Sequence, residues 1–230
     1  MKTIGILGGM SAASTQLYYQ HLCRLTQESL GGLHSPELLI RSLNFDVIER
    51  YQASDNWQAA AQVLNTEALS LERGGAQLLL LATNTMHKLA DDMMQGVNIP
   101  MIHIADATAN AIVSAGLKSP GLMATRFTME QTFYTDRLKQ ADLAVRIPAR
   151  NDRDTTHNII YNELCKNMTT TDSRLQYEQI AQGLVDDGAD CLILGCTEVG
   201  MLLNSENVSV PVFDTTLIHC KAALDASLSS

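Results

Sequence analysis

Short apolar runs alternate along the chain with longer stretches in which apolar side chains recur at the helical period. This alternation is typical of βαβ units, in which helices cover both faces of a parallel sheet. The strands are predicted at residues 3–9, 37–45, 77–83, 99–104, 121–125, 143–149, 191–196 and 210–214. The helices are predicted at residues 11–30, 57–73, 84–94, 129–141, 155–166, 172–187 and 218–228. We therefore expect an α/β fold.

The same run of strand, loop and polar residues occurs twice. GGAQLLLLATNT ends at Thr85, and DGADCLILGCTE, which ends at Glu198, matches it position by position. Further segments match in the same order, residues 5–19 with 121–134 and residues 97–103 with 208–214. Because the blocks keep their order, they indicate an internal duplication of the chain.

The duplication predicts two pseudo-symmetric domains, each with a parallel sheet flanked by helices. The N-terminal domain comprises residues 1–98 and 208–230, and the C-terminal domain comprises residues 99–207. Ligands of parallel sheets bind beyond the carboxyl ends of the strands. The matched strands end at Thr83 and Cys196. We expect the active site in the interdomain cleft, with these two side chains serving opposite faces of one small molecule.

The composition excludes several classes of partner. Of the 230 residues, 46% are hydrophobic and 18% are charged, which is ordinary for a globular protein, and we expect no membrane association. A net charge of −9 without a basic cluster argues against nucleic acid. The five cysteines show no CxxC spacing and the six histidines no HxH or HExxH pattern, so we expect no disulfide framework and no metal. We infer a reducing, cytoplasmic location.

Cys196 is the strongest candidate for chemistry. It ends a strand and precedes Thr197 and Glu198, where the amides of a following helix would activate the thiol as a thiolate. The alternative for any cysteine is an inert, buried thiol. We assign that alternative to Cys23, Cys191 and Cys220.

Thr83 by itself has two interpretations, a hydroxyl that caps the next helix and a reactive group. Its match to Cys196 favours the reactive group. His87, one turn later, either tunes a proton or caps the helix. The glycines near the first strand do not form a dinucleotide-binding fingerprint, because GILGGM lacks the GxGxxG spacing.

The motifs GGMS, NTMH and GCTE together resemble those of the aspartate/glutamate racemases that work without pyridoxal phosphate. The resemblance spans nearly the whole chain. It implies an enzyme without a cofactor in which two cysteines, on opposite walls of an interdomain cleft, exchange the α-proton of an acidic amino acid. The second cysteine of the family falls on Cys196, whereas Thr83 stands where the first is expected.

The threonine changes the chemistry that the resemblance implies. A thiol ionises near neutral pH when its site lowers its pKa, but an alcohol does not. We therefore expect Cys196 to act as the thiolate base and Thr83 as the proton donor on the opposite face. The resemblance assigns the L isomer to the face of the second cysteine, so we expect an L-preferring aspartate/glutamate racemase.

The resemblance also implies a set of substrate-binding residues. These are Met10, Ser11, Gln52, Asn84, Thr85, Thr128, Lys166, Thr197 and Glu198. Gln52 and Thr128 are expected near the substrate side chain, and Lys166 is expected to pair with a carboxylate. Neither Arg41 nor Arg50 matches the arginine that the family places near its second strand.

Other interpretations remain at this point. The chain could bind an amino acid or dicarboxylate with little or no catalysis. It could also be related to hydantoin racemases or maleate isomerases, which share the doubled scaffold. The resemblance further implies a homodimer.

Overall fold

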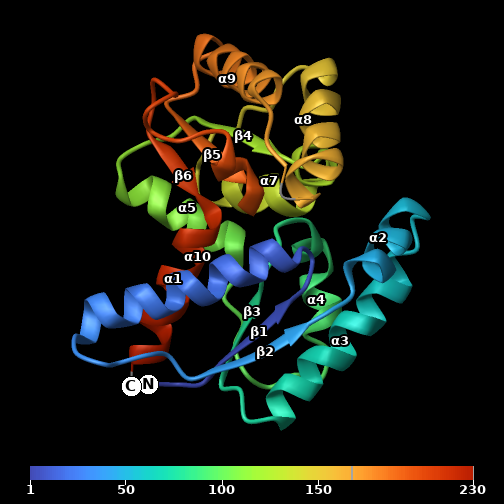
Figure 1. Ribbon diagram of the computed structural model, residues 1–230, viewed down its shortest axis with the longest axis vertical. Helices are drawn as coiled ribbons and strands as arrows, with labels where there is room; N and C mark the ends of the chain where they lie inside the picture. Colours follow the sequence, from blue (N-terminus) through green and yellow to red (C-terminus); the bar gives the residue numbers. More distant parts are fainter. Residues whose placement is uncertain (167, 230) are drawn as a thin grey trace. The chain divides into compact units, whose positions relative to one another are not determined.

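The computed structural model describes residues 1–166 and 168–229, and Figure 1 shows the course of the chain. It consists of two compact units. Unit 1 comprises Met1–His103 and His219–Ser230, and unit 2 comprises Ile104–Ile218. The α/β class and the two parallel sheets flanked by helices confirm the predicted fold class.

Unit 1 contains a parallel sheet in the order β2-β1-β3. Its strands are β1 (Ile4–Gly8), β2 (Leu38–Ser42) and β3 (Leu78–Leu81), and Met101 adds an isolated bridge to Leu79. Its helical segments are α1 (Ala12–Leu30), α2 (Phe45–Ala53), α3 (Trp57–Arg73), the 3₁₀ helix η1 (Thr85–Leu89), α4 (Ala90–Met93) and most of α10 (Thr215–Leu228).

Unit 2 contains a second parallel sheet in the order β4-β5-β6. Its strands are β4 (Pro120–Ala124), β5 (Cys191–Gly195) and β6 (Val212–Asp214), and Arg146 adds an isolated bridge to Gly121. Its helical segments are α5 (Ile104–Ser114), α6 (Arg126–Glu130), α7 (Thr132–Gln140), α8 (Arg150–Asn162), η2 (Leu164–Lys166), α9 (Thr171–Asp186) and η3 (Thr197–Met201).

Alternating side chains bury both faces of each sheet. In β3, Leu78 and Leu80 join the apolar cluster that includes residues of α1 and α10, whereas Leu79 and Leu81 join the cluster that includes residues of α3. Neighbouring residues of a strand point to opposite faces, so a continuous apolar run fits a sheet with helices on both sides. The β5 run of unit 2 is divided in the same way between two clusters.

The two units repeat each other in detail. Gly5 of β1 pairs with Leu79 of β3, and Gly121 of β4 pairs with Leu192 of β5. The Leu79 N–H donates to the carbonyl of Pro100 at 2.9 Å, and the Leu192 N–H donates to that of Pro211 at the same distance. These pairs are the ones that the sequence repeat aligns, so the duplication is present in the strand register itself.

Two predicted strands are reduced to single bridges. Residues 99–104 contribute only Met101, and residues 143–149 contribute only Arg146. Two α-helices, α2 and α5, and the 3₁₀ helix η3 lie outside the predicted helices. The Asn44 side chain caps α2 by accepting from the Asp46 N–H at 3.2 Å, so a polar stretch that resembles a loop is helical.

The boundaries of the units differ from the predicted domains. Residues 208–218 belong to unit 2, because β6 pairs with β5. Residues 99–103 belong to unit 1, because Met101 bridges to Leu79. Within the described ranges, the helices are too short or too polar to cross a membrane.

Candidate active site

Thr83 lies just beyond β3, with its main chain held at both ends. Its N–H donates to the Leu81 carbonyl at 2.8 Å, and its own carbonyl accepts from Nδ1 of His87 at 2.7 Å. The residue is only 9% exposed, and the buried Asn84 and Thr85 follow it into η1. The hydroxyl of Thr83 therefore sits on a backbone that is fixed from two sides.

The glycine-rich loop after β1 reaches the same edge of the unit 1 sheet. Ser11 is buried and caps α1 by accepting from the Ser14 N–H at 3.2 Å. Ser14 in turn donates its hydroxyl to the carbonyl of Ala82, the residue before Thr83, at 3.0 Å. Gly9 has a φ of 85° and lies against the main chain of Leu43, so only glycine fits there. The loop thus places Ser11, with the buried Met10 beside it, near the Thr83 strand end.

Gln52 is a buried residue of α2 and not part of an exposed loop. Its amide Nε2 lies 3.0 Å from the sulfur of Met86, a residue of η1. The contact brings Gln52 to the segment that begins at Thr83. The family resemblance assigned Gln52 to the site, whereas the local sequence by itself favoured a solvated loop residue.

Cys196 ends the equivalent strand of unit 2. Its Sγ–H donates to Oε2 of Glu198 at 3.0 Å, and the hydroxyl of Thr197 donates to the same oxygen. Glu198 is only 3% exposed, so its carboxylate is a nearly buried acceptor for both groups.

The surroundings of Cys196 favour the neutral thiol. Burial raises the pKa of Cys196 well above its ordinary value, and the negative charge of Glu198 raises it further. The main-chain N–H of Glu198 lowers the pKa of Cys196, as predicted for the amides that follow the strand, but burial and the Glu198 charge outweigh it, so the net shift is upward. Cys165 is also affected, since burial and Glu198 raise its pKa to about 12.

The end of β4 lies beside Cys196, because Ala124 pairs with Gly195 in parallel register. The Thr125 side chain there caps α6 by accepting from the Thr128 N–H at 3.4 Å, and the two hydroxyl oxygens lie 3.2 Å apart. Both threonines are buried. Thr128 therefore belongs to the same strand edge as Cys196.

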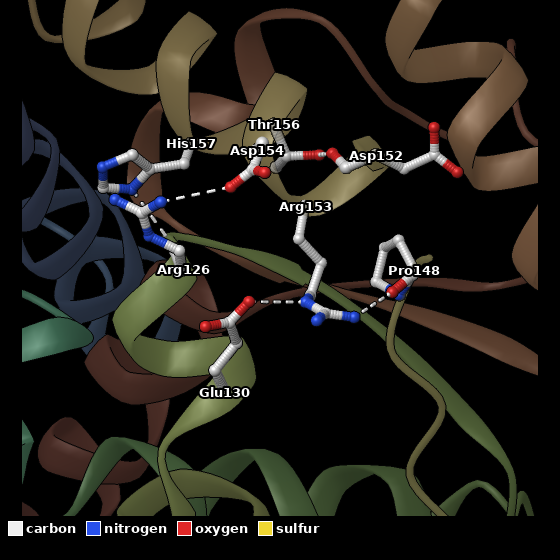
Figure 2. Close-up of polar contacts among 8 residues, drawn as sticks. All are labelled: Arg126, Glu130, Pro148, Asp152, Arg153, Asp154, Thr156 and His157. Atoms are coloured by element: carbon white, nitrogen blue, oxygen red, sulfur yellow. Dashed lines mark hydrogen bonds and ion pairs between the residues drawn. The ribbon is translucent and has the colours of Figure 1, made fainter. Parts of the chain in front are cut away.

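Arg126 follows Thr125 directly and brings a positive charge to this edge. Figure 2 shows the Arg126 guanidinium beside Asp154 of α8. The two side chains form an ion pair of 3.1 Å. The main-chain N–H of Arg126 donates to Nδ1 of His157 at 3.3 Å. Burial and the charge of Arg126 lower the pKa of His157, which keeps that nitrogen available as an acceptor. Arg126 is not among the residues predicted from the sequence, although its place between Thr125 and Thr128 in a matched block was a usable signal.

Lys166 is an exposed residue of η2, and η2 packs against η3, the segment that carries Glu198. The two arginines near the second strand are engaged elsewhere. Arg41 pairs with Glu67 at 2.6 Å, and Arg50 pairs with Asp46 at 2.8 Å. Arg126 and Lys166 are thus two cations on segments next to the Cys196 edge, one directly after Thr125 and the other on η2.

The predicted residues form two groups, one at the carboxyl edge of each sheet. The group in unit 1 contains Met10, Ser11, Gln52, Thr83, Asn84 and Thr85. The group in unit 2 contains Thr128, Lys166, Cys196, Thr197 and Glu198. Among the residues that the structure describes, His, Cys, Asp and Glu side chains form no cluster suited to a metal ion.

Comparisons with known proteins identify the family to which this chain is similar. Residues 7–223 match the sequence model of the Asp/Glu/hydantoin racemase family. The crystal structure of a candidate Asp/Glu racemase from Yersinia pestis is 44% identical over the full length of both chains, with a TM-score of 0.92. An aspartate racemase homologue from Pyrococcus horikoshii is 33% identical over the full length of both chains, with a TM-score of 0.86. The broad-specificity amino-acid racemase RacX of Bacillus subtilis is 22% identical over 98% of each chain.

Proposed function

The chain belongs to the Asp/Glu/hydantoin racemase family of isomerases, and from this premise we propose that it racemises acidic amino acids without a cofactor. In this proposal Cys196 removes the α-proton of L-aspartate or L-glutamate, and Thr83 supplies a proton to the opposite face. The observation that carries it is the hydrogen bond from Cys196 to Glu198, at the strand end equivalent to that of Thr83.

The base must first lose its own proton. Glu198 Oε2, 3.0 Å from Sγ, accepts that proton and leaves a thiolate. The raised pKa of Cys196 makes this transfer unfavourable in the free protein. A bound substrate ammonium near the thiol favours the thiolate electrostatically, so the base forms mainly when substrate is present.

Proton transfer to the thiolate leaves the electron pair of the broken C–H bond on the α-carbon. Inversion requires a proton on the other face, which Thr83 donates as its oxygen regains one from water. An alcohol is a weak acid, so proton donation by Thr83 is the slow step. The equal free energies of the L and D isomers require equal kcat/KM values in the two directions. The proposed L preference must therefore come from saturation of the enzyme with substrate and from slow redistribution of protons between Thr83 and Cys196.

A dicarboxylic substrate needs positive charge, and unit 2 offers Lys166 and Arg126 at the proposed edge. An arginine binds a carboxylate through two parallel hydrogen bonds, so the substrate would replace Asp154 as its partner. The remaining polar contacts are assigned to Met10, Ser11, Asn84, Thr85 and Thr197 for the amino-acid end, and to Gln52 and Thr128 for the side chain.

The acidic preference is tested by the variants K166M and R126M with L-aspartate and L-alanine. The broad-specificity name of RacX makes L-alanine the informative comparison. Loss of a carboxylate-binding cation should raise KM for L-aspartate by roughly tenfold and leave L-alanine unchanged. Equal effects on both substrates would contradict recognition of the side-chain carboxylate.

The reaction itself is tested by incubating the protein with L-aspartate or L-glutamate in deuterium oxide and following the α-proton by NMR. We expect exchange accompanied by slower inversion. C196A should abolish exchange, whereas C23A, which alters a cysteine of α1, should leave it unchanged. Binding without exchange would overturn the proposal and favour a non-catalytic amino-acid-binding protein.

A further inference from the structure

Three buried histidines of unit 1 form a cluster behind Thr83. The ring of His87 lies 4.5 Å from that of His103 and 5.6 Å from that of His219, with edge-on geometry in both pairs. Their exposed fractions are 2%, 6% and 0%. His103 and His219 are also the residues at which the chain leaves unit 1 and returns to it.

His87 contacts Thr83 directly through its main chain. A carbonyl oxygen can only accept, so Nδ1 of His87 carries the hydrogen in the 2.7 Å bond to the Thr83 carbonyl. The main-chain N–H of His87 also donates to the Asn84 carbonyl, at 3.1 Å. The imidazole is thus part of the turn that orients the Thr83 hydroxyl.

His219 packs against that imidazole as a neutral ring held by hydrogen bonds on both of its nitrogens. Its Nε2 lies 2.8 Å from the Ile102 carbonyl and therefore donates, which leaves Nδ1 to accept from the hydroxyl of Tyr18 at 2.7 Å. Burial lowers the pKa of His219 to about 4, so the ring is neutral at physiological pH. Both ring nitrogens are engaged, which leaves His219 a packing role against His87.

The equivalent strand end in unit 2 is built differently. The sequence repeat aligns Gly200 with His87, so no imidazole follows Cys196. The carbonyl of Cys196 accepts instead from the main-chain N–H of Val199 at 3.0 Å. The ionisable neighbour of Cys196 is Glu198, whose counterpart in the repeat is Thr85. The mismatch between the two halves therefore extends to the groups that support each reactive side chain.

We propose that His87 is a positioning residue for Thr83: its Nδ1–H holds the Thr83 carbonyl, while His103 and His219 hold the ring. The inference rests on the proposed function, in which Thr83 delivers the proton for inversion. His87 does not touch the reacting atoms in this account. It sets the direction of the threonine hydroxyl, and a misplaced donor slows inversion without affecting proton removal by Cys196.

The test uses substitutions that separate the Nδ1 hydrogen bond from the bulk of the ring. In H87N the amide nitrogen occupies the position of Nδ1 and can still donate to the Thr83 carbonyl. In H87Q the amide reaches the position of Nε2 instead, and H87L has no donor. The full-length protein and each variant are incubated with L-aspartate in deuterium oxide, and the rates of α-proton exchange and of inversion are measured separately.

We expect H87L and H87Q to lower the ratio of inversion to exchange by roughly tenfold, since small displacements of a reacting group cost that much or more. H87N should restore the ratio to near that of the unaltered protein. If H87L does not fold, the contrast between H87Q and H87N carries the test, because both side chains are polar amides.

The outcomes separate the inference from the function on which it rests. An unchanged ratio in H87L or H87Q, or a ratio equally lowered in H87N, would overturn the role of His87 and leave the racemase intact. A merely structural role would lower exchange and inversion together and would also overturn it. No exchange in the unaltered protein would overturn the proposed function and this inference with it.

Discussion

The thiol of Cys196 donates to the carboxylate of Glu198 across 3.0 Å, and the carboxylate is nearly buried. The pair has two properties that oppose each other. The negative charge raises the pKa of Cys196 and opposes ionisation, yet the same oxygen is the acceptor in place for its proton. Removing Glu198 should therefore affect thiol acidity and catalysis in opposite directions.

The variant E198Q tests this relationship. We expect the pKa of Cys196 to fall, because a neighbouring charge that disfavours the thiolate is gone, while α-proton exchange falls by at least about tenfold through loss of the general base. Thiol acidity is measured from the pH dependence of alkylation by iodoacetamide, and exchange by NMR. E206Q, at an exposed glutamate, is the matched control and should change neither quantity. A parallel loss of acidity and exchange would contradict a proton transfer from Cys196 to Glu198.

Substitutions of Thr83 test the donor on the opposite face. T83V keeps the shape of the side chain without the hydroxyl, so inversion of L-aspartate should fall by at least about a hundredfold while α-proton exchange persists. T83C should raise turnover of the D isomer, because a thiol can act as a base as well as a donor. Turnover of D-aspartate that is the same in T83C as in the unaltered protein would show that another group serves this face.

The paired glycines offer a test of the duplication by stability. A Cβ at Gly5 would lie 2.8 Å from Cβ of Ala76, and a Cβ at Gly121 would lie 2.8 Å from Cδ2 of Leu192. Both substitutions by alanine should destabilise the fold, within the range of about 1–3 kcal/mol for overpacking. G5A should cost more, because the Ala76 Cβ cannot rotate away and the end of a leucine can.

Urea denaturation of G5A and G121A provides the measurement. G183A is the control, because Gly183 lies within α9 with open space around it, and alanine there should stabilise the protein by about 0.5–1 kcal/mol. A larger loss of stability in G121A than in G5A would contradict the role assigned to the rigid Ala76 contact.

Buried His219 predicts an acid-dependent loss of stability. Its pKa is lowered from 6.5 to about 4, so between these values the unfolded chain binds a proton that the folded chain does not. The free energy of unfolding should therefore fall as the pH falls through this window, by up to about 3 kcal/mol from this group, with no contribution above it.

The variant H219Q isolates this contribution. It should be less stable than the unaltered protein near neutral pH but should lose less further stability on acidification. H34Q, at an exposed histidine, should follow the unaltered protein throughout. Equal acid dependence in H219Q and the unaltered protein would mean that His219 does not remain neutral in the folded state.

Each strand that the structure describes lies within a predicted range to within one residue, and the reason is clearest for the four that are buried on both faces. β1, β3, β4 and β5 lie within the predicted ranges to within one residue, because a continuous apolar run between a glycine-rich turn and a helix has few alternatives. Residues 99–104 and 143–149 were predicted as strands from similar patterns. Their pairing depends on a neighbouring strand far away in the sequence. In these two segments only Met101 and Arg146 form a bridge to such a strand.

The sequence by itself determined the duplication, the parallel α/β class and the equivalence of Thr83 and Cys196. The spacing of apolar residues and the alignment of the repeated segments follow directly from the order of residues in the chain. The tertiary structure decided the state of the reactive groups. Glu198 and the surrounding core keep Cys196 a thiol, and histidines from distant segments enclose His87 behind Thr83. Protonation depends on burial and on neighbouring charge: Glu198, two residues further along, supplies the charge, whereas segments far apart in the chain supply the burial.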